Sequence, residues 1–261
     1  MDRSILVRLV GFRAGFFHGD FLVYDRWRWL RKRLPKTRNG ERLIDVGCGT
    51  GQFTIAAALR GYDAIGLSWD RRNQDVASRR ASLCRAKAAF PIQDVRKLHE
   101  KNEFVGQFDI AVCFETIEHI MDDRKLVRDI HACLRPGGTL LLTAPRYLLR
   151  AITPEDNGPF RKVEDGGHLR RGYTPAMLRE LCAQAGFAVE EISSCSGFFA
   201  QKCTWLLRKL RRGPVPLVWL ALLPLRILPP LLDRLLARLT GWPDFTICLV
   251  AYKPRFPPEP Q

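Results

Sequence analysis

The sequence predicts an α/β fold in which helices cover a mostly parallel, seven-stranded sheet. Short apolar runs typical of strands alternate with amphipathic helical patterns from Glu41 to Ser193, at the spacing of repeated βα units. A seventh strand-like run, 246–252, follows after a long interruption. The chain has 261 residues, which suits one α/β core with an added segment, so we expect no second catalytic domain.

The individual elements follow from apolar periodicity and from capping residues. Helices are expected after Gly51, Trp69 and Asp122, where polar residues stand near a helix start. The clearest helical pattern covers 175–185, where Thr174 provides the cap and apolar residues recur at helical period. The predicted strands are 42–46, 63–67, 88–93, 109–114, 139–144, 187–192 and 246–252.

Two segments lie outside this alternation. In 196–243, between the sixth and seventh strands, a nearly charge-free run is interrupted by prolines and by Arg226, which argues against a straight transmembrane helix of about 20 residues. Broken amphipathic helices that form a lid or an interfacial face are one interpretation, and an extra core layer is the other. The predicted units are an N-terminal helical cap (1–40), the core (41–195), the apolar helical insertion (196–243), and the last strand with a proline-rich tail (244–261).

Composition limits the compartment and the partners. The eight cysteines include no CxxC pair and no Cys/His pair at zinc spacing, which favours buried thiols in a reducing cytoplasm. The N-terminus does not have the pattern of a signal peptide. A net charge of +15 is compatible with solvated helix faces, peripheral contact with an anionic membrane, or a nucleic-acid partner. Nucleic acid is the less favoured partner, because the basic runs are not interleaved with base-stacking aromatics.

A glycine-rich turn directly after the first predicted strand is the most informative motif. The run LIDVGCGTGQF ends a strand at Asp45 and continues through Gly47, Gly49 and Gly51 into a helix that starts at Gln52. Alternate glycines let the backbone turn sharply and approach a ligand closely. The spacing is GxGxG, in contrast to the GxGxxG of dinucleotide sites. With free amides at the helix start, such a turn suits a zwitterionic amino-acid tail.

This motif and those that follow it resemble the class I S-adenosylmethionine-dependent methyltransferases, especially the small-molecule group that includes the ubiquinone-pathway O-methyltransferases. The resemblance covers about residues 41–192. It implies a Rossmann-like, seven-stranded, mostly parallel sheet with helices on both faces and an antiparallel last strand. It also implies that S-adenosyl-L-methionine is the cofactor. The matching residues of the methionine-binding loop are Asp45, Gly47, Cys48, Gly49 and Gly51.

The next two family landmarks concern the ribose and the adenine. An acidic residue normally ends the second strand and binds both ribose hydroxyls, but here AIGLSWD places Ser68 at that point and Asp70 two residues later. We expect one of these two near the ribose. In FPIQDVRKL the resemblance assigns Asp94 to the exocyclic amine of adenine and Val95 to the ring, with a helix cap as the alternative role of Asp94.

Candidates for the chemistry follow the fourth strand. The motif ExxEH contains Glu115, Glu118 and His119, and His168 lies in EDGGHLRRGYT. In related O-methyltransferases similar residues bind a magnesium-like ion, so these four are candidate ligands for Mg²⁺ or another divalent cation. His119 or His168 as a metal-free general base is a second interpretation, with Glu115 as a further catalytic candidate, and a structural role is a third.

The sequence leaves the methyl acceptor open. A small lipophilic hydroxyl or phenol is favoured by ExxEH together with the apolar insertion. The basic charge favours an RNA 2′-O-methyltransferase as an alternative, and Ser68 in place of the ribose acid leaves a non-catalytic scaffold as another. No NPPY or DPPY motif follows the fourth strand, which argues against base or amide N-methylation.

Overall fold

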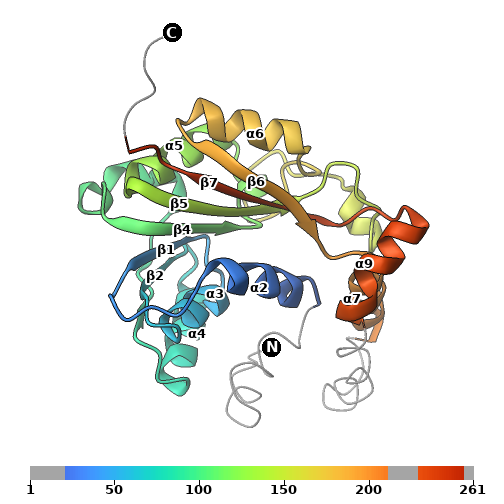
Figure 1. Ribbon diagram of the computed structural model, residues 1–261, viewed down its shortest axis with the longest axis horizontal. Coiled ribbons are helices and arrows are strands. Elements are labelled where there is room, and N and C mark those ends of the chain that lie inside the picture. Colours follow the sequence, from blue (N-terminus) through green and yellow to red (C-terminus); the bar gives the residue numbers. More distant parts are fainter. Residues whose placement is uncertain (1–20, 211–228, 256–261) are drawn as a thin grey trace.

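The computed structural model describes residues 21–210 and 229–255, which form a twisted seven-stranded sheet in the order β3-β2-β1-β4-β5-β7-β6 (Figure 1). The pairs β1–β2, β1–β4, β2–β3 and β4–β5 are parallel, whereas β7 runs antiparallel to both of its neighbours. The predicted fold class is therefore confirmed. The strands are β1 (Arg42–Val46), β2 (Asp63–Leu67), β3 (Ala88–Ala89), β4 (Phe108–Phe114), β5 (Leu134–Pro145), β6 (Ala188–Cys195) and β7 (Thr246–Tyr252).

Four strands differ from their predicted bounds, and β4 does so only by starting one residue earlier. The strand expected at 88–93 is only two residues long, because Pro91 has no N–H to donate and Ile92 meets Ser68 only through an isolated bridge. The strand β5 begins five residues earlier than expected, and a register shift between Phe108 and Ile110 accommodates the added stretch. The strand β6 extends to Cys195, where it still pairs with β7.

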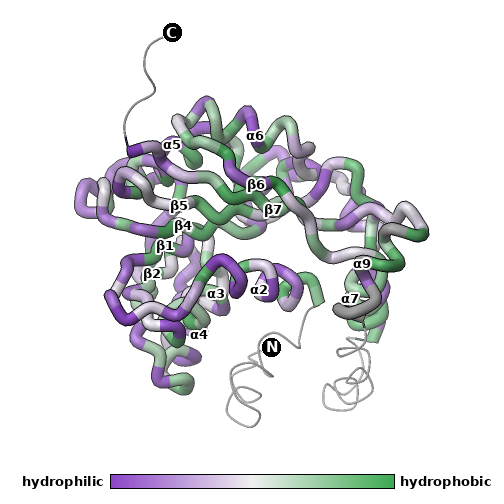
Figure 2. The backbone as a smooth tube through the Cα atoms, in the orientation of Figure 1, coloured by the Kyte–Doolittle hydropathy of each residue, from purple (hydrophilic) through white to green (hydrophobic). Residues whose placement is uncertain are grey.

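Helices cover both faces of the sheet. Alternation along β1 sends Ile44 into one buried cluster with α5 and α6, and Leu43 into a second cluster with α2 and α3. Figure 2 shows this distribution, with hydrophobic residues along the strands and hydrophilic ones on the outer turns. The helices are α2 (Phe21–Arg33), α3 (Gln52–Ala58), α4 (Arg71–Leu83), α5 (Asp123–Cys133), α6 (Pro175–Gln184), α7 (Phe198–Leu210) and α9 (Pro229–Thr240).

The predicted helix caps are present. Asp122 accepts a hydrogen bond from the Lys125 N–H at 2.9 Å, and Thr174 accepts one from the Met177 N–H at 3.2 Å. Each side chain satisfies a backbone donor that the first helical turn leaves without a partner. The helix starts expected after Asp122 and at residue 175 are therefore confirmed, and α4 also begins where a helix was expected after Trp69.

The insertion between β6 and β7 packs beside α2 at one end of the molecule (Figure 1). Phe21 of α2 contacts Ala200 and Cys203 of α7, and Asp233 of α9 accepts a hydrogen bond from the Phe199 N–H at 2.8 Å. The helical character predicted for this insertion is thus seen in its two described parts. The start of the predicted N-terminal cap, the middle of the insertion and the end of the tail lie outside the described residues.

Two further expectations concern thiols and membrane spans. All eight cysteines are free thiols, although Cys195 Sγ and Cys248 Sγ lie 3.5 Å apart on neighbouring strands. Among the helices of residues 21–210 and 229–255, none combines the length and the apolar character that crossing a bilayer requires.

Candidate active site

The glycine-rich loop leaves β1 as a tight left-handed turn at the carboxyl edge of the sheet. Gly47, Gly49 and Gly51 have φ angles of 84°, 52° and 78°, a region that side chains disfavour. The N–H groups of Gly47 and Cys48 both donate to the Leu67 carbonyl at the end of β2, at 3.1 and 2.9 Å. The loop is therefore fixed to two adjacent strands, beside the point where the strand order reverses. Ligands of open α/β sheets bind at such a point.

Two of these glycines differ in what lies beside them. A Cβ atom on Gly47 would lie 2.3 Å from Thr116 Oγ1, so close packing against the end of β4 requires glycine there. A Cβ atom on Gly49 would meet no atom within 4 Å. The open side of the loop is therefore at Gly49, where a ligand can approach the backbone. The assignment of this loop to the methionine end of S-adenosyl-L-methionine stays a prediction.

Two other predicted loop residues face the protein interior. Asp45 is buried, and its Oδ2 accepts a hydrogen bond of 2.7 Å from Thr54 Oγ1 in α3. Burial raises the pKa of Asp45 to about 7. The Cys48 thiol lies 3.4 Å from Gln74 Oε1 in α4, and burial raises its pKa as well. Both side chains hold the loop against the helices that follow β1 and β2.

The two predicted ribose residues lie together after β2. Ser68 is buried, and its Oγ accepts a hydrogen bond of 3.2 Å from the Asp70 N–H. Asp70 Oδ1 accepts from the Arg72 N–H at 2.8 Å and so caps α4. The Asp70 carboxylate thus stabilises the helix start, while the Ser68 O–H lies at the strand end itself.

The predicted adenine residues open a 3-10 helix, η1 (Val95–Glu100). Asp94 caps this helix through the Arg96 N–H at 3.0 Å, which is the alternative role that the sequence allowed. The Arg96 guanidinium also donates to both carboxylate oxygens, through Nε to Oδ1 at 2.9 Å and through Nη2 to Oδ2 at 2.5 Å. These hydrogen bonds lower the pKa of Asp94. Val95 is buried beside it, and the adenine contact stays a prediction.

A 3-10 turn directly after β4, η3 (Ile117–His119), brings three of the four candidate ligand residues together. Glu118, His119 and His168 each offer a ligand atom within 4.8 Å of the other two. The two imidazole rings meet edge to face with their centroids 4.6 Å apart, and Glu118 Oε1 lies 3.9 Å from His119 Nε2.

Burial shifts the pKa values of two residues in the group formed by Glu118, His119 and His168, and some of its buried polar atoms lack hydrogen-bond partners within the described residues. Burial, together with the nearby Glu115, holds the pKa of Glu118 well above its ordinary value. Burial and the neighbouring His119 lower the pKa of His168. Within the described residues, neither oxygen of the Glu118 carboxyl nor Nδ1 of His119 has a hydrogen-bond partner. One carboxylate and two imidazoles are a donor set that suits a divalent cation, and the orphaned atoms of this set belong to Glu118 and His119.

Glu115, the first residue of ExxEH, has a different environment. Its backbone adopts a left-handed φ of 49°, and its carboxylate lies 3.1 Å from Arg26 Nη1 in α2. It also accepts a hydrogen bond of 3.1 Å from Thr143 Oγ1 in β5. The fourth candidate ligand is therefore engaged with α2 and β5, apart from the group formed by Glu118 and the two histidines.

The segment that carries His168 is tied to the turn after β4 by contacts that sequence reasoning did not identify. The Leu169 N–H donates to the Glu118 carbonyl at 3.0 Å, and Tyr173 Oη donates to the Ile117 carbonyl at 3.1 Å. Arg170 donates to the Ile120 carbonyl at 2.7 Å. The motif HLRRGYT contained these side chains, but their partners lie about 50 residues away in sequence.

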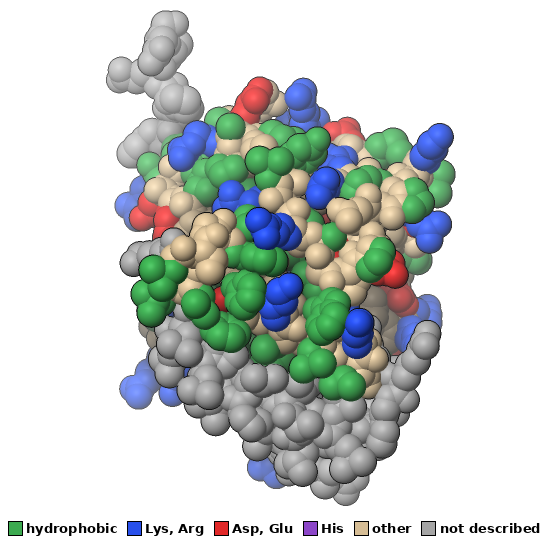
Figure 3. All heavy atoms as spheres, turned by 90° about the vertical axis from the view of Figure 1, so that its right-hand side faces the viewer, with side chains coloured by type: hydrophobic (Ala, Val, Ile, Leu, Met, Phe, Trp, Pro, Cys, Tyr) green, Lys and Arg blue, Asp and Glu red, His purple; other side chains and the backbone are tan. Residues whose placement is uncertain are grey.

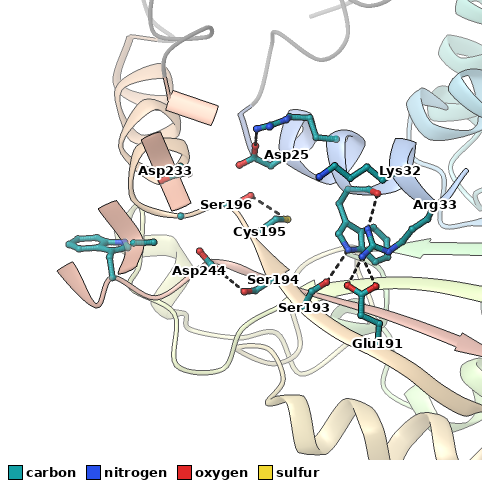
Figure 4. A pocket seen from close by; sticks show the side chains of 15 residues that line it. Asp25, Lys32, Arg33, Glu191, Ser193, Ser194, Cys195, Ser196, Asp233 and Asp244 are labelled. Carbon is teal, nitrogen blue, oxygen red and sulfur yellow. Dashed lines mark hydrogen bonds and ion pairs between the residues drawn. The ribbon is translucent and has the colours of Figure 1, made fainter. Parts of the chain in front are cut away.

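A separate cavity of about 490 Å³ lies between α2, the end of β6 and α9 (Figure 4). Asp25 and Lys32 line it from α2, Asp233 lines it from α9, and Asp244 lines it from the stretch before β7. Burial, and then the charge of Asp233, raises the pKa of Asp25 to about 7. None of the predicted cofactor or metal residues lines this cavity, so it is distinct from the site at the glycine loop.

The sheet order, the glycine loop at the end of β1 and the polar residues after β2, β3 and β4 together define the architecture of a class I S-adenosylmethionine-dependent methyltransferase. A family model described as a methyltransferase domain matches residues 21–192. The chain belongs to this methyltransferase family.

Among curated relatives, the ubiquinone biosynthesis O-methyltransferase of Psychrobacter arcticus is 30% identical over 158 residues. That stretch is 59% of this chain and 61% of the relative, so the match spans less than two thirds of the Psychrobacter protein. The ubiquinone biosynthesis O-methyltransferase of Pseudomonas aeruginosa is 27% identical over 172 residues, which are 64% of this chain and 72% of that relative.

Solved structures share the fold. Phosphoethanolamine N-methyltransferase 2 of Haemonchus contortus, in complex with S-adenosyl-L-methionine, has a TM-score of 0.62 at 18% identity and covers 97% of this chain and 60% of its own. An S-adenosylmethionine-dependent methyltransferase from Mesorhizobium loti has a TM-score of 0.56 at 21% identity, covering 87% of this chain and 97% of its own.

Proposed function

We propose that this methyltransferase transfers the methyl group of S-adenosyl-L-methionine to a hydroxyl or phenol oxygen of a small lipophilic acceptor. The observation that carries the proposal is the group formed by Glu118 and His119, directly after β4, and by His168 of the connection between β5 and α6. The glycine loop meets the same strand end, because Gly47 packs against Thr116. The names of the curated relatives, which describe O-methylation, support the same chemistry.

The roles of the side chains follow from the geometry. When bound, the cofactor supplies an electrophilic methyl group for in-line displacement. The chain must hold the acceptor in line and remove the hydroxyl proton. A neutral imidazole can accept that proton, and burial, which lowers the pKa of His168, favours the neutral form of its ring. The alternative is a divalent cation held by Glu118, His119 and His168, which would lower the pKa of the acceptor hydroxyl, so that neither imidazole would have to serve as the base.

Apolar side chains on the same edge support a lipophilic acceptor. Met121 follows η3 and is 59% exposed, and Val163, in the segment that carries His168, is 63% exposed. Tyr147 and Leu148 follow β5 and are 48% and 72% exposed. Exposed apolar groups at the carboxyl ends of adjacent strands can shed water onto a bound hydrophobic acceptor.

The test is incubation of the protein with methyl-labelled S-adenosyl-L-methionine and three fractions of a cell extract: lipid-soluble compounds, total RNA and protein. Each reaction is run with and without EDTA, and His168→Ala serves as the impaired variant. We expect label in the lipid-soluble fraction, on an ether oxygen identified by mass spectrometry. Label on RNA 2′-oxygens or on nitrogen would overturn the proposal.

We also propose that α7 and α9 bring the enzyme to the surface of an anionic membrane, where lipophilic acceptors reside. Trp205, Leu235 and Leu239 are 40%, 55% and 72% exposed on these helices. Lys209 Nζ lies 4.2 Å from the ring centre of Trp205. Figure 3 shows this end of the molecule, where hydrophobic side chains are interspersed with lysine and arginine. Such a mixture suits an interface of acyl chains and phosphate headgroups.

Vesicle sedimentation tests the membrane proposal. Vesicles of phosphatidylglycerol should bind the full chain, and vesicles of phosphatidylcholine should bind it at least tenfold less. The pair Leu235→Glu with Leu239→Glu should reduce binding, whereas Leu83→Glu, at a 44% exposed leucine of α4, should leave it unchanged. Equal binding by both variants would contradict the assignment of this face.

A further inference from the structure

Glu164 joins three segments that lie far apart in the sequence. Its Oε2 accepts a hydrogen bond of 2.9 Å from Arg96 Nη1, and its Oε1 accepts one of 2.6 Å from the Met121 N–H. Glu164 itself belongs to the connection between β5 and α6, four residues before His168. The side chain is 22% exposed, so water screens these contacts only in part.

The same connection reaches across the edge of the sheet to the end of β2. A Cβ atom on Gly166 would lie 3.9 Å from the Trp69 ring, and Trp69 directly follows Ser68. Since β2 and β5 lie on opposite sides of β1 and β4 in the sheet, the connection passes over the strands that carry the glycine loop and η3. Its path therefore borders both the predicted cofactor site and the histidine pair.

Arg96 links Glu164 to the predicted adenine residue. Its planar guanidinium donates to Asp94 through Nε and Nη2 and to Glu164 through Nη1. A guanidinium has five donors in a fixed plane, so it can serve both carboxylates at once, and the position of one carboxylate restricts the position of the other. Arg96 therefore forms a continuous bridge from Asp94 to the segment that carries His168.

We propose that Glu164 is a positioning residue that couples binding of the adenosine end of the cofactor to the placement of His168. This inference rests on the proposed function, because it takes residues 94 and 95 as the adenine side of the site. Cofactor binding restricts the position of Asp94. Through Arg96, it then restricts Glu164 and the connection between β5 and α6 that carries His168. By reciprocity, loss of the Arg96–Glu164 link weakens cofactor binding.

Amide hydrogen exchange of the full chain, with and without saturating S-adenosylhomocysteine, tests this coupling. In the wild type we expect the ligand to slow exchange in 92–98 and in 161–172. In Glu164→Gln the ligand should still slow exchange in 92–98 but lose its effect in 161–172, and its Kd measured by calorimetry should rise about fivefold. Glu180→Gln is the matched control, because Glu180 is an exposed residue of α6 that accepts a hydrogen bond from Gln184 of the same helix and lies outside 92–98 and 161–172.

Arg96→Lys gives a second variant should Glu164→Gln fold poorly, since it keeps the charge and removes the planar fork. If a variant exchanges faster than the wild type in 161–172, both with and without ligand, and its Kd is unchanged, the link is only structural and the proposal is overturned. Protection of 161–172 equal to the wild type would overturn it as well. If the ligand binds the wild type without protecting 92–98, the adenine assignment itself is wrong, and the coupling falls with it.

Discussion

The guanidinium of Arg26 lies 3.1 Å from the carboxylate of Glu115, and this ion pair joins α2 to the end of β4. Both side chains are largely buried, at 11% and 19% exposure. The left-handed backbone of Glu115 turns its carboxylate toward α2, while Glu118, three residues later, faces the histidines. Two acidic residues of one short motif thus have different partners, and their substitution should have different consequences.

Glu115→Gln should lower the free energy of unfolding by about 1–3 kcal/mol, because it removes the negative charge of a largely buried ion pair. Urea denaturation gives this value, and a double-mutant cycle with Arg26→Gln isolates the coupling between the two groups. Glu103→Gln, at an exposed glutamate, is the control and should change stability by less than about 0.5 kcal/mol. An additive cycle would show that the pair contributes no stability.

Alanine at two glycines of the loop should separate folding from ligand binding. Gly47→Ala places a methyl group against Thr116 and should destabilise the fold strongly. In Gly49→Ala the added methyl group meets no neighbouring atom in the free protein. The free energy of unfolding should therefore fall by only about 1–2 kcal/mol, which is the strain of alanine in a left-handed conformation. Because the added methyl group occupies the open side of the loop, the Kd for S-adenosylhomocysteine should rise at least tenfold in calorimetry. An unchanged Kd in Gly49→Ala would place the cofactor elsewhere.

The cofactor loop was predictable from the sequence because its determinants are local. Three glycines at alternate positions after a buried strand require left-handed turns, and a helix must follow at once. The caps at Asp122 and Thr174 are equally local. The short third strand also had a visible signal in Pro91, which cannot donate to a parallel neighbour.

The partners of the candidate chemical groups could not be predicted, because they depend on contacts between distant segments. Arg26 and Glu115 are 89 residues apart, and Arg96 and Glu164 are 68 apart. A pattern such as ExxEH specifies residue types and spacing, whereas the φ of 49° at Glu115 decides which way its side chain points. The sequence therefore grouped four residues, of which the structure brings three together.

Stability should fall as the pH rises toward neutrality because of Asp45. Burial raises its pKa to about 7 in the folded state, whereas an unfolded aspartate titrates near 4, so the folded chain binds an extra proton between these values. The contribution of protonated Asp45 to the free energy of unfolding is fully present below about pH 4. It is lost as the pH rises through about 7, and the total loss is up to about 4 kcal/mol. Urea denaturation at pH 5 and pH 8 should show a larger loss in the wild type than in Asp45→Asn, whose side chain does not titrate. Equal losses would mean that Asp45 is ionised throughout.

Metal binding should depend on the two histidines that meet after β4 and should be nearly independent of Glu115. We expect His119→Ala and His168→Ala each to weaken Mn²⁺ binding at least tenfold in titrations followed by electron paramagnetic resonance, since each removes a nitrogen ligand. Glu115→Gln should retain the affinity, because that carboxylate is engaged by Arg26 and Thr143. His99→Ala, at a histidine whose side chain is 49% exposed, controls for surface binding. If the wild type does not bind Mn²⁺ stoichiometrically, the metal hypothesis is wrong and the imidazoles remain as metal-free bases. If Glu115→Gln loses as much Mn²⁺ affinity as His168→Ala does, Glu115 belongs to the ligand set.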